Sequence, residues 1–312
     1  MECAFTPKDR TGRSPMDSMT AVKLISPTLL FLMTLGMGMT MTWQDVQRIV
    51  RYPKAIGVGV VNQAVVLPLV GFAMVQAFDV SPEIAVGVML LTFCPGGVGS
   101  NISTLLARGD IALSVSLTLV SGCLIVVTLP VLTNAAMGYF LGEALPRTLP
   151  VGETALRLVL MVLLPVALGM LINHRWPDFT ARAERYVKAS GFVLLSLMIV
   201  AVLAKEYQTF VAYSQQAGAV VTALCASTMA IGFVSARLFR LNRAQSTSIC
   251  IEVGIQNTLL ALVIAGLLER AYLSIPAVIY VVVSSAMLLV VIVWANLPTR
   301  RPAPASRSAR EH

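Results

Sequence analysis

Long apolar runs alternate with short polar gaps along the chain of 312 residues. A helix needs about 20 apolar residues to cross a bilayer, and a window of that length predicts nine membrane spans. Their approximate limits are residues 22–42, 54–78, 82–107, 111–140, 152–173, 188–204, 213–236, 246–268 and 272–295. The polar ends, residues 1–21 and 298–312, are expected to be flexible tails on a transmembrane transporter domain of residues 22–297.

Composition and charge support a membrane protein. Hydrophobic residues make up 57% of the chain, charged residues 12%, and the mean hydropathy is +0.81, which predicts an all-α polytopic membrane protein. The net charge of +8 does not indicate nucleic-acid binding, because Lys and Arg concentrate in alternate gaps between spans. By the positive-inside rule these gaps are cytoplasmic. We therefore expect a protein of the cell inner membrane with its N-terminus outside and its C-terminus in the cytoplasm.

The third span is interrupted within residues 93–104. Pro95 lacks an amide proton and clashes with the preceding helical turn. Gly96, Gly97 and Gly99 each disfavour helix by about 1 kcal/mol relative to Ala. Non-helical backbone at this depth is tolerated only where it is buried in protein or lines a polar cavity, so the interruption predicts a binding site.

A second interruption is predicted in the eighth span, where residues 251–258 place polar groups at mid-depth. Two interrupted helices in corresponding places of two halves are typical of the binding site of a secondary transporter. The third and eighth spans differ by five in rank, and an odd number of helices per repeat inverts the second repeat in the membrane. The sequence therefore predicts an inverted-repeat transporter.

Glu252 is the only carboxylate deep within any predicted span. Burying a charge at that depth costs at least ~2.5 kcal/mol, so Glu252 is a candidate functional residue. The other interpretation is a protonated Glu that is hydrogen-bonded inside the helix bundle. Neutral oxygen donors, which hard cations prefer, surround both interruptions: Ser100, Asn101, Ser103, Thr104, Gln256 and Asn257. One carboxylate among neutral oxygens suits a monovalent cation. Sodium is the predicted ion, and a proton carried on Glu252 is the alternative.

No Lys or Arg lies at mid-depth to hold an anion, but new half-helices are expected to begin near Ser100 and Asn257. Their N-terminal dipoles and unpaired N–H groups favour negative charge, so a carboxylate substrate can be held there. Four side chains in the second and fourth spans are candidates to complete the site: Asn62, Gln63, Ser114 and Thr118. Ser121 extends the row of Ser114 and Thr118 by about one turn, although such hydroxyls more often bond within their own helix.

Two motifs resemble the signatures of the bile acid:sodium symporter family. They are residues 94–101 with 106–118, and residues 252–257, and the likeness runs from about residue 30 to 290. The resemblance implies a bacterial member that imports an organic anion with sodium by alternating access. The anion would be bile-acid-like or a small carboxylate such as pantoate or pyruvate.

The same resemblance implies a fold of two domains in which the two interrupted helices cross. The core would comprise residues of about 54–140 and 213–295, and the panel about 22–42 and 152–204. Substrate would bind between them. Bacterial relatives often carry ten helices, so the chain is expected to lack the first, which makes the panel smaller.

By motif, the resemblance also implies two sodium sites and a substrate site. One sodium site would comprise Ser100, Asn101, Ser114, Thr118 and Glu252. The other would comprise Gln63, Glu252, Gln256 and the backbone carbonyls of Val253 and Ile255. Asn257 and the backbone amides near Val98 and Gly99 would face the substrate. Val98 stands where a Thr is common in the family. The missing hydroxyl concerns the substrate site rather than the ion sites.

Other functions remain to be separated from sodium symport. A carrier of the same superfold that exports arsenite or auxin would use Cys94 as a soft ligand, and a proton-coupled anion transporter would use Glu252 alone. An enzyme is not expected, because one deep acid stands without a deep His, Lys or Arg to pair with. The expected partners are sodium ions, a small organic anion and membrane lipid, with no cofactor and no nucleic acid. The sequence leaves the oligomeric state open.

Overall fold

The computed structural model describes residues 18–142, 149–183 and 207–297, with six single positions between 186 and 200. These residues form helices joined by short connections, and the one β-bridge among them joins Gly96 to Gln256. The predicted all-α fold is therefore confirmed. The first helix begins at Ser18, within the stretch expected as a tail, while residues 1–17 and 298–312 lie outside the described residues.

The helices follow the predicted spans closely. They are α1 (Ser18–Thr40), α2 (Trp43–Arg51), α3 (Pro53–Val61), η1 (Asn62–Val66), α4 (Leu67–Ala77), α5 (Pro82–Phe93), α6 (Val98–Leu106), α7 (Ile111–Leu141), α8 (Val151–Leu158), η2 (Val159–Leu163), α9 (Leu164–Arg175), α11 (Tyr207–Leu238), α12 (Arg243–Gly254), α13 (Thr258–Leu267), η3 (Ala271–Ser274) and α14 (Ile275–Asn296). The η1 and η2 segments are single π-helical turns inside otherwise continuous helices. Eight of the nine predicted spans coincide with these elements, and the remaining one, at residues 188–204, falls almost wholly outside the described residues.

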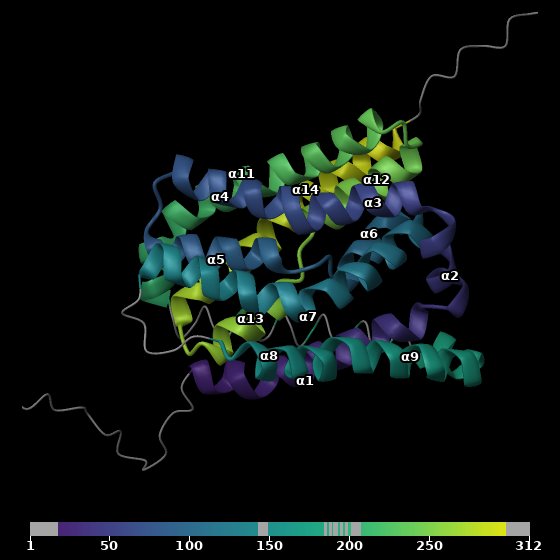
Figure 1. Ribbon diagram of the computed structural model, residues 1–312, viewed down its shortest axis with the longest axis horizontal. Helices are drawn as coiled ribbons and strands as arrows, with labels where there is room; N and C mark the ends of the chain where they lie inside the picture. Colours follow the sequence, from purple (N-terminus) through teal and green to yellow (C-terminus); the bar gives the residue numbers. More distant parts are fainter. Residues whose placement is uncertain are drawn as a thin grey trace, which may run out of the picture.

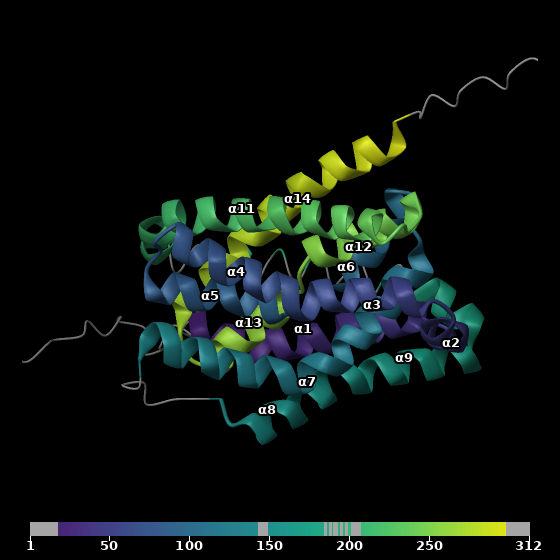
Figure 2. The same cartoon turned by 45° about the horizontal axis from the view of Figure 1, so that its top comes forward.

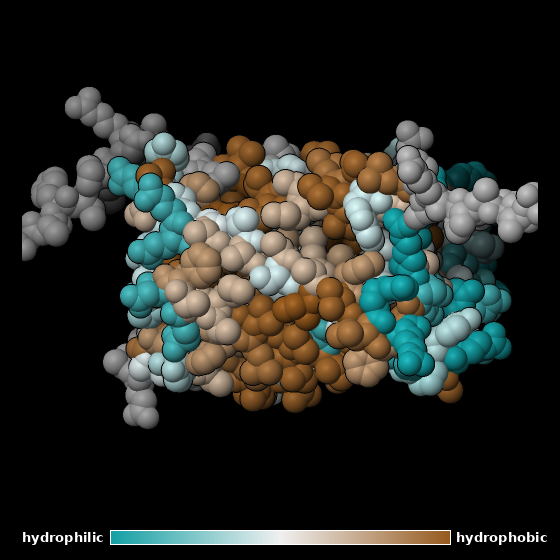
Figure 3. All heavy atoms as spheres, turned by 90° about the horizontal axis from the view of Figure 1, so that it is seen from above, coloured by the Kyte–Doolittle hydropathy of each residue, from teal (hydrophilic) through white to brown (hydrophobic). Residues whose placement is uncertain are grey.

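Among the described residues, five helices are long and apolar enough to cross a membrane. They are Pro53–Ala77, Ile111–Leu141, Val151–Arg175, Phe210–Leu238 and Tyr272–Asn296. Figure 3 shows a broad apolar zone across the middle of the molecule and polar side chains at both ends of its long axis. The protein is therefore a multi-pass membrane protein, while the count of nine spans stays a prediction.

The turns expected on the cytoplasmic side meet at one end of the bundle. The amide of Asp110, just after α6, donates to the carbonyl of Ala244 in α12 over 3.3 Å. At the same end, the Arg243 guanidinium donates to the carbonyl of Trp294 near the end of α14 over 3.4 Å. The turn after α6, the start of α12 and the end of α14 were all expected on the same side of the membrane, and they lie together in the structure.

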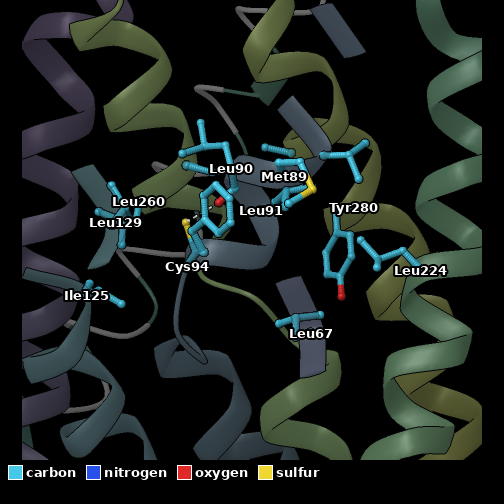
Figure 4. Close-up of a cluster of buried hydrophobic side chains, with 14 of the residues drawn as sticks. Leu67, Met89, Leu90, Leu91, Cys94, Ile125, Leu129, Leu224, Leu260 and Tyr280 are labelled. Carbon is cyan, nitrogen blue, oxygen red and sulfur yellow. Dashed lines mark hydrogen bonds between the residues drawn. The ribbon is translucent and has the colours of Figure 1, made fainter. Parts of the chain in front are cut away.

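One half of each interrupted helix, α5 and α13, lies inside the protein. In α5, every residue from Ile84 to Phe93 is buried, and in α13 so is every residue from Thr258 to Gly266. Figure 4 shows Leu90 and Leu91 of α5 and Leu260 of α13 within one apolar cluster. The longer helix α14 packs against both of them and exposes much of its apolar surface. This placement follows from the interruptions, because freed backbone groups cannot face lipid.

Helix α1 packs along α9 and η2, and these elements lie together along one edge in Figure 1. Gly38 and Gly169 permit the close approach, since a Cβ on Gly38 would overlap the backbone of Val166 and one on Gly169 would overlap the backbone of Leu35. Figure 2 shows α11 and α14 on the side of the molecule opposite α8 and α9. Helix α1 reaches the other elements mainly through α13.

A short helix that the sequence did not predict, α2, joins α1 to α3. None of its residues is buried, and it rests on α7, where the Ser116 hydroxyl donates to the carbonyl of Asp45 over 3.1 Å.

The two interrupted regions share local details. Helices α5 and α12 both have 12 residues, and a residue with positive φ precedes each, Asp79 (φ 46°) and Arg240 (φ 57°). Arg108 (φ 53°) and Glu269 (φ 56°) take the same conformation just after α6 and α13. Such left-handed residues commonly end helices. The two regions therefore have the same succession of elements.

Candidate functional site

The first interruption lies between α5 and α6. Cys94 is extended (φ −76°, ψ 145°), the conformation that a following proline such as Pro95 favours. Gly97 is also extended (φ −98°, ψ 175°), and α6 begins at Val98. The new half-helix thus starts two residues before Ser100, near which it was expected.

The second interruption, between α12 and α13, crosses the first. Gly96 and Gln256 form an antiparallel bridge, and the amide of Asn257 donates to the carbonyl of Pro95 over 2.8 Å. Backbone groups freed by one interruption are thereby satisfied by the other, which meets the requirement for non-helical backbone at membrane depth. We call this crossing of residues 94–97 and 255–257 the crossover.

Glu252 lies in the last turn of α12, beside the crossover, and is 1% exposed. The Thr118 hydroxyl donates to its Oε1 over 2.5 Å, and the Ser114 hydroxyl lies 2.9 Å from its Oε2. The Ser114 hydroxyl also lies 2.8 Å from Oδ1 of Asn101. Side chains from α6, α7 and α12 therefore converge on one carboxylate, and Ser114 and Thr118, four residues apart on α7, reach it from the same helix face.

Gly96 lets the crossover pass directly over this carboxylate. A Cβ on Gly96 would overlap Oε1 of Glu252, whereas a Cβ on Gly97 would meet its nearest atom at 3.5 Å and one on Gly99 would meet nothing within 4 Å. Only the first glycine of the run is thus required by contact with Glu252.

The polar residues of α6 divide into two groups. The hydroxyls of Ser100 and Ser103 donate to carbonyls of their own helix region, Gly97 over 2.7 Å and Gly99 over 2.6 Å. Asn101 faces the carboxylate cluster, and its Nδ2 is buried without a partner. Ser100 is buried as well, and its hydroxyl, which donates to Gly97, also lies close enough to the Glu252 carboxylate to interact with it.

A second polar cluster lies beside the first. The Gln63 amide Nε2 donates to the carbonyl of Cys94 over 2.8 Å and to Oε1 of Gln256 over 2.9 Å. The Gln256 amide Nε2 donates to the carbonyl of Val253 over 2.6 Å. The Oε1 of Gln63 is buried without a partner. The structure therefore brings Gln63, Val253 and Gln256 together, with Ile255 between the last two.

Asn62 does not join this cluster. Its Nδ2 donates to the carbonyl of Val58 over 2.7 Å and to the Ser235 hydroxyl of α11 over 2.9 Å. Of the two adjacent amides considered in the second span, only Gln63 reaches the crossover.

A cavity of about 180 Å³ borders the crossover on the side of α1 and α14. Gly97, Gly99, Ile255 and Asn257 line it. Two of the residues expected to face the substrate, Gly99 and Asn257, therefore border a cavity. The Asn257 Oδ1 also accepts from the amide of Leu260 over 3.0 Å and caps α13. For Val98 the structure gives the backbone position at the start of α6.

Several residues at the site were missed by sequence reasoning. Thr34 of α1 and the pair Ser284 and Ser285 of α14 line the cavity. Tyr280 donates its hydroxyl to the carbonyl of Gly254, the last residue of α12, over 2.9 Å. Their only signal in sequence was a polar group within an apolar span, which is more often bonded within the helix bundle.

Cys94 faces away from the cavity. It is fully buried, its thiol lies 3.3 Å from the carbonyl of Leu90, and Figure 4 shows it within the apolar cluster. This position offers no support for a role as a soft ligand.

The donor set fits sodium as a transported ion. The two clusters present carboxylate, hydroxyl, amide and backbone oxygens, which hard cations prefer. Within the described residues no group of three or more His, Cys, Asp or Glu gathers as a multi-acid cation site would require. Of the two unpartnered atoms in these clusters, the oxygen Oε1 of Gln63 can ligate a cation, whereas Nδ2 of Asn101 is a donor.

Comparison with known proteins gives a consistent result. Residues 27–213 match the model of the sodium bile acid symporter family. The chain is 31% identical to the probable sodium/metabolite cotransporter BASS2 of Oryza sativa chloroplasts, over 75% of this chain and 54% of that protein. It is 31% identical to the human ileal sodium/bile acid cotransporter, over 77% of this chain and 68% of that protein. An uncharacterized sodium-dependent transporter of Bacillus subtilis is 29% identical, over 78% and 74% of the respective chains. The chain thus spans about half the length of the plant relative.

Proposed function

Because the chain belongs to the sodium bile acid symporter family, we propose that it is a sodium-coupled secondary active symporter that imports an organic anion. The observation that supports this most strongly is the buried carboxylate of Glu252, held by the hydroxyls of Ser114 and Thr118 beside the crossover. The family is one of sodium symporters rather than enzymes, so the prediction that the chain is not an enzyme is confirmed.

The first sodium ion is proposed to bind among the oxygens of Ser100, Asn101, Ser114, Thr118 and Glu252. Four of these side chains already lie in one row of contacts, from Asn101 to Ser114, from Ser114 to Glu252 and from Glu252 to Thr118. A cation there would replace the hydroxyl protons that now face Glu252, because those hydroxyls can rotate to present their lone pairs.

The second sodium ion is proposed to bind Gln63, Glu252, Gln256 and the carbonyls of Val253 and Ile255. The Gln256 amide now donates to the Val253 carbonyl, so it would have to rotate to present its oxygen. Amide orientation is assigned from the surrounding hydrogen bonds, and a cation reverses that preference.

Charge explains why two ions and one anion would move together. Two sodium ions, the Glu252 carboxylate and a monovalent anionic substrate sum to zero charge. A neutral set is far less costly to enclose at mid-membrane than any partly loaded set. Sodium binding should therefore raise the affinity for the anion, and the anion must raise sodium affinity by the same factor.

The substrate is proposed to occupy the cavity beside the crossover, held by Asn257 and the backbone amides near Val98 and Gly99. The N-termini of α6 and α13 start at this cavity, and no Lys or Arg is among its lining residues. Helix N-termini attract anions through their dipoles and free N–H groups. A cavity of about 180 Å³ favours a small carboxylate over a bile acid among the candidate substrates.

Alternating access is proposed to move two parts of the protein against each other. Helix α1 with α8, η2 and α9 would form the panel, and the helices from α3 to α7 and from α11 to α14 would form the core. The shared succession of elements around the two interruptions supports an inverted repeat within the core. We further propose the cell inner membrane as the location, with the N-terminus outside and the C-terminus in the cytoplasm, from the side on which basic residues gather.

Uptake into proteoliposomes tests this function. Vesicles containing the protein would be given an inward sodium gradient and a set of labelled anions, including taurocholate, pantoate and pyruvate. We expect at least one anion to accumulate, replacement of sodium by choline to abolish accumulation, and Glu252→Gln to do the same. Accumulation that follows a proton gradient and ignores sodium would support the proton-coupled alternative instead.

A further inference from the structure

Helix α2 has three faces with different surroundings. One faces the protein, because Ile49 packs against the buried core and the Asp45 carbonyl accepts from the Ser116 hydroxyl of α7 over 3.1 Å. A second is apolar, and its Trp43 and Val50, about two turns apart, are 68% and 83% exposed. The third is polar and comprises Gln44, Gln47, Arg48 and Arg51.

Contacts within the protein do not account for this helix. An isolated helix shorter than about 12–15 residues is marginal in water, and α2 has nine residues, none of them buried. Its first turn is fixed by Asp45, whose carboxylate accepts from the amide and the hydroxyl of Thr42 over 2.9 and 2.7 Å. The apolar face with Trp43 and Val50 is left uncovered by the described residues, so a partner outside the chain has to cover it.

Helix α2 lies at the end of the bundle where basic residues gather (Figure 1). It joins the end of α1 to the start of α3 and rests on α7 near its start. The turn before α7 carries Arg108 and the turn before α12 carries Arg240, both exposed, and a backbone hydrogen bond joins these two turns. Asp45 is the only acid from residue 18 to residue 78. The surroundings of α2 are therefore positively charged.

The two arginines of α2 differ in their partners. Arg48 donates to Oδ1 of Asp45 over 3.3 Å, an exposed ion pair of the kind that contributes little in water. Arg51 is exposed, forms no ion pair with any described residue, and is followed three positions later by the exposed Lys54 at the start of α3. A free guanidinium thus stands next in sequence to the exposed Val50.

We propose that α2 lies in the membrane interface and binds the headgroup of an anionic phospholipid, with Arg51 at the phosphate and with Trp43 and Val50 among the acyl chains. Interfacial helices combine an apolar face that carries Trp with a polar face that carries Arg or Lys, as α2 does. The positive charge favours an anionic lipid over a zwitterionic one. A free phosphate ion would leave Trp43 and Val50 in water. The site does not depend on the proposed sodium and substrate sites.

Photochemical crosslinking tests the site. The full chain is placed in phosphatidylcholine nanodiscs with a trace of phosphatidylglycerol, or of phosphatidylcholine, that carries a diazirine next to its headgroup, and labelled peptides are identified by mass spectrometry. The peptides of α2 should be labelled at least about fivefold more by the phosphatidylglycerol reagent, the factor that one basic residue near an anionic surface contributes. High salt should reduce this preference. Equal labelling by the two reagents, or no labelling of α2, would overturn the proposal.

Matched variants locate the charge that matters. Arg51→Gln should reduce phosphatidylglycerol labelling of α2 about fivefold without changing phosphatidylcholine labelling, and Arg51→Lys should retain the preference. Arg240→Gln removes the same charge from the same end of the bundle but outside α2, so it should leave the labelling of α2 unchanged. Equal losses in the two Gln variants would indicate a diffuse positive surface and contradict a site at α2. Excess inorganic phosphate should not compete, and competition would mean that a free anion is the occupant.

Discussion

Replacing Gly96 by Ala should damage sodium binding while leaving the helices intact. The added methyl group would overlap Oε1 of Glu252, and the carboxylate would have to retreat by about 1 Å to reach normal van der Waals distance. That movement breaks the 2.5 Å hydrogen bond from Thr118. The backbone itself is not strained, because φ at Gly96 is not positive.

The size of the effect follows from the cost of overpacking, typically ~1–3 kcal/mol. If the strain falls on the carboxylate, sodium affinity should decrease by about 5- to 150-fold. Sodium titration by calorimetry, in a nanodisc and with the potassium concentration constant, measures this. Gly97→Ala and Gly99→Ala are matched controls, because their methyl groups have room. Equal sodium affinity in the Gly96 and Gly97 variants would refute the contact as the reason for glycine.

Three further changes test other parts of the structure. Tyr280→Phe removes the donor to the Gly254 carbonyl, so the free energy of unfolding should decrease by about 1–3 kcal/mol and the melting temperature should fall. An unchanged melting temperature would mean that another hydrogen bond replaces this one. Asn257→Asp keeps an acceptor for the Leu260 amide but adds negative charge beside the substrate cavity, so the affinity for the anion should fall more than about tenfold while thermal stability is retained. Unchanged anion binding would remove Asn257 from the substrate site. Gly169→Leu should separate α9 from α1 and lower stability by about 1–3 kcal/mol, whereas a neutral effect in a denaturation curve would contradict the tight packing seen there.

The interruptions and the central acid were predictable from sequence because their physical cost is large and local. Pro95 and its neighbouring glycines cannot continue a helix, and one carboxylate in an apolar span has few acceptable explanations. The spacing of Ser114 and Thr118 also placed both hydroxyls on one helix face, and the structure has both on Glu252.

The remaining parts of the site depend on rotations and partners that sequence patterns do not encode. Asn62 and Gln63 are adjacent and chemically alike, and neighbouring residues of a helix project in different directions, but only the structure shows that Gln63 reaches the crossover and Asn62 reaches Ser235. Thr34 and Tyr280 are single polar groups in apolar helices. The Thr34 hydroxyl donates within its own helix to the carbonyl of Leu30, and only the packing of α1 beside the crossover places it at the cavity. The Tyr280 hydroxyl reaches α12 only because α14 packs beside it.

The central claim is that Glu252 at the crossover binds sodium. The most direct test is the melting temperature of the purified protein as sodium is added at constant ionic strength with potassium. A ligand that binds only the folded state at 100 times its Kd stabilises it by about 2.7 kcal/mol. The wild-type protein should gain stability from sodium and not from potassium, and Glu252→Gln should fold yet gain none. A Glu252→Gln protein stabilised by sodium as strongly as the wild type would contradict the account.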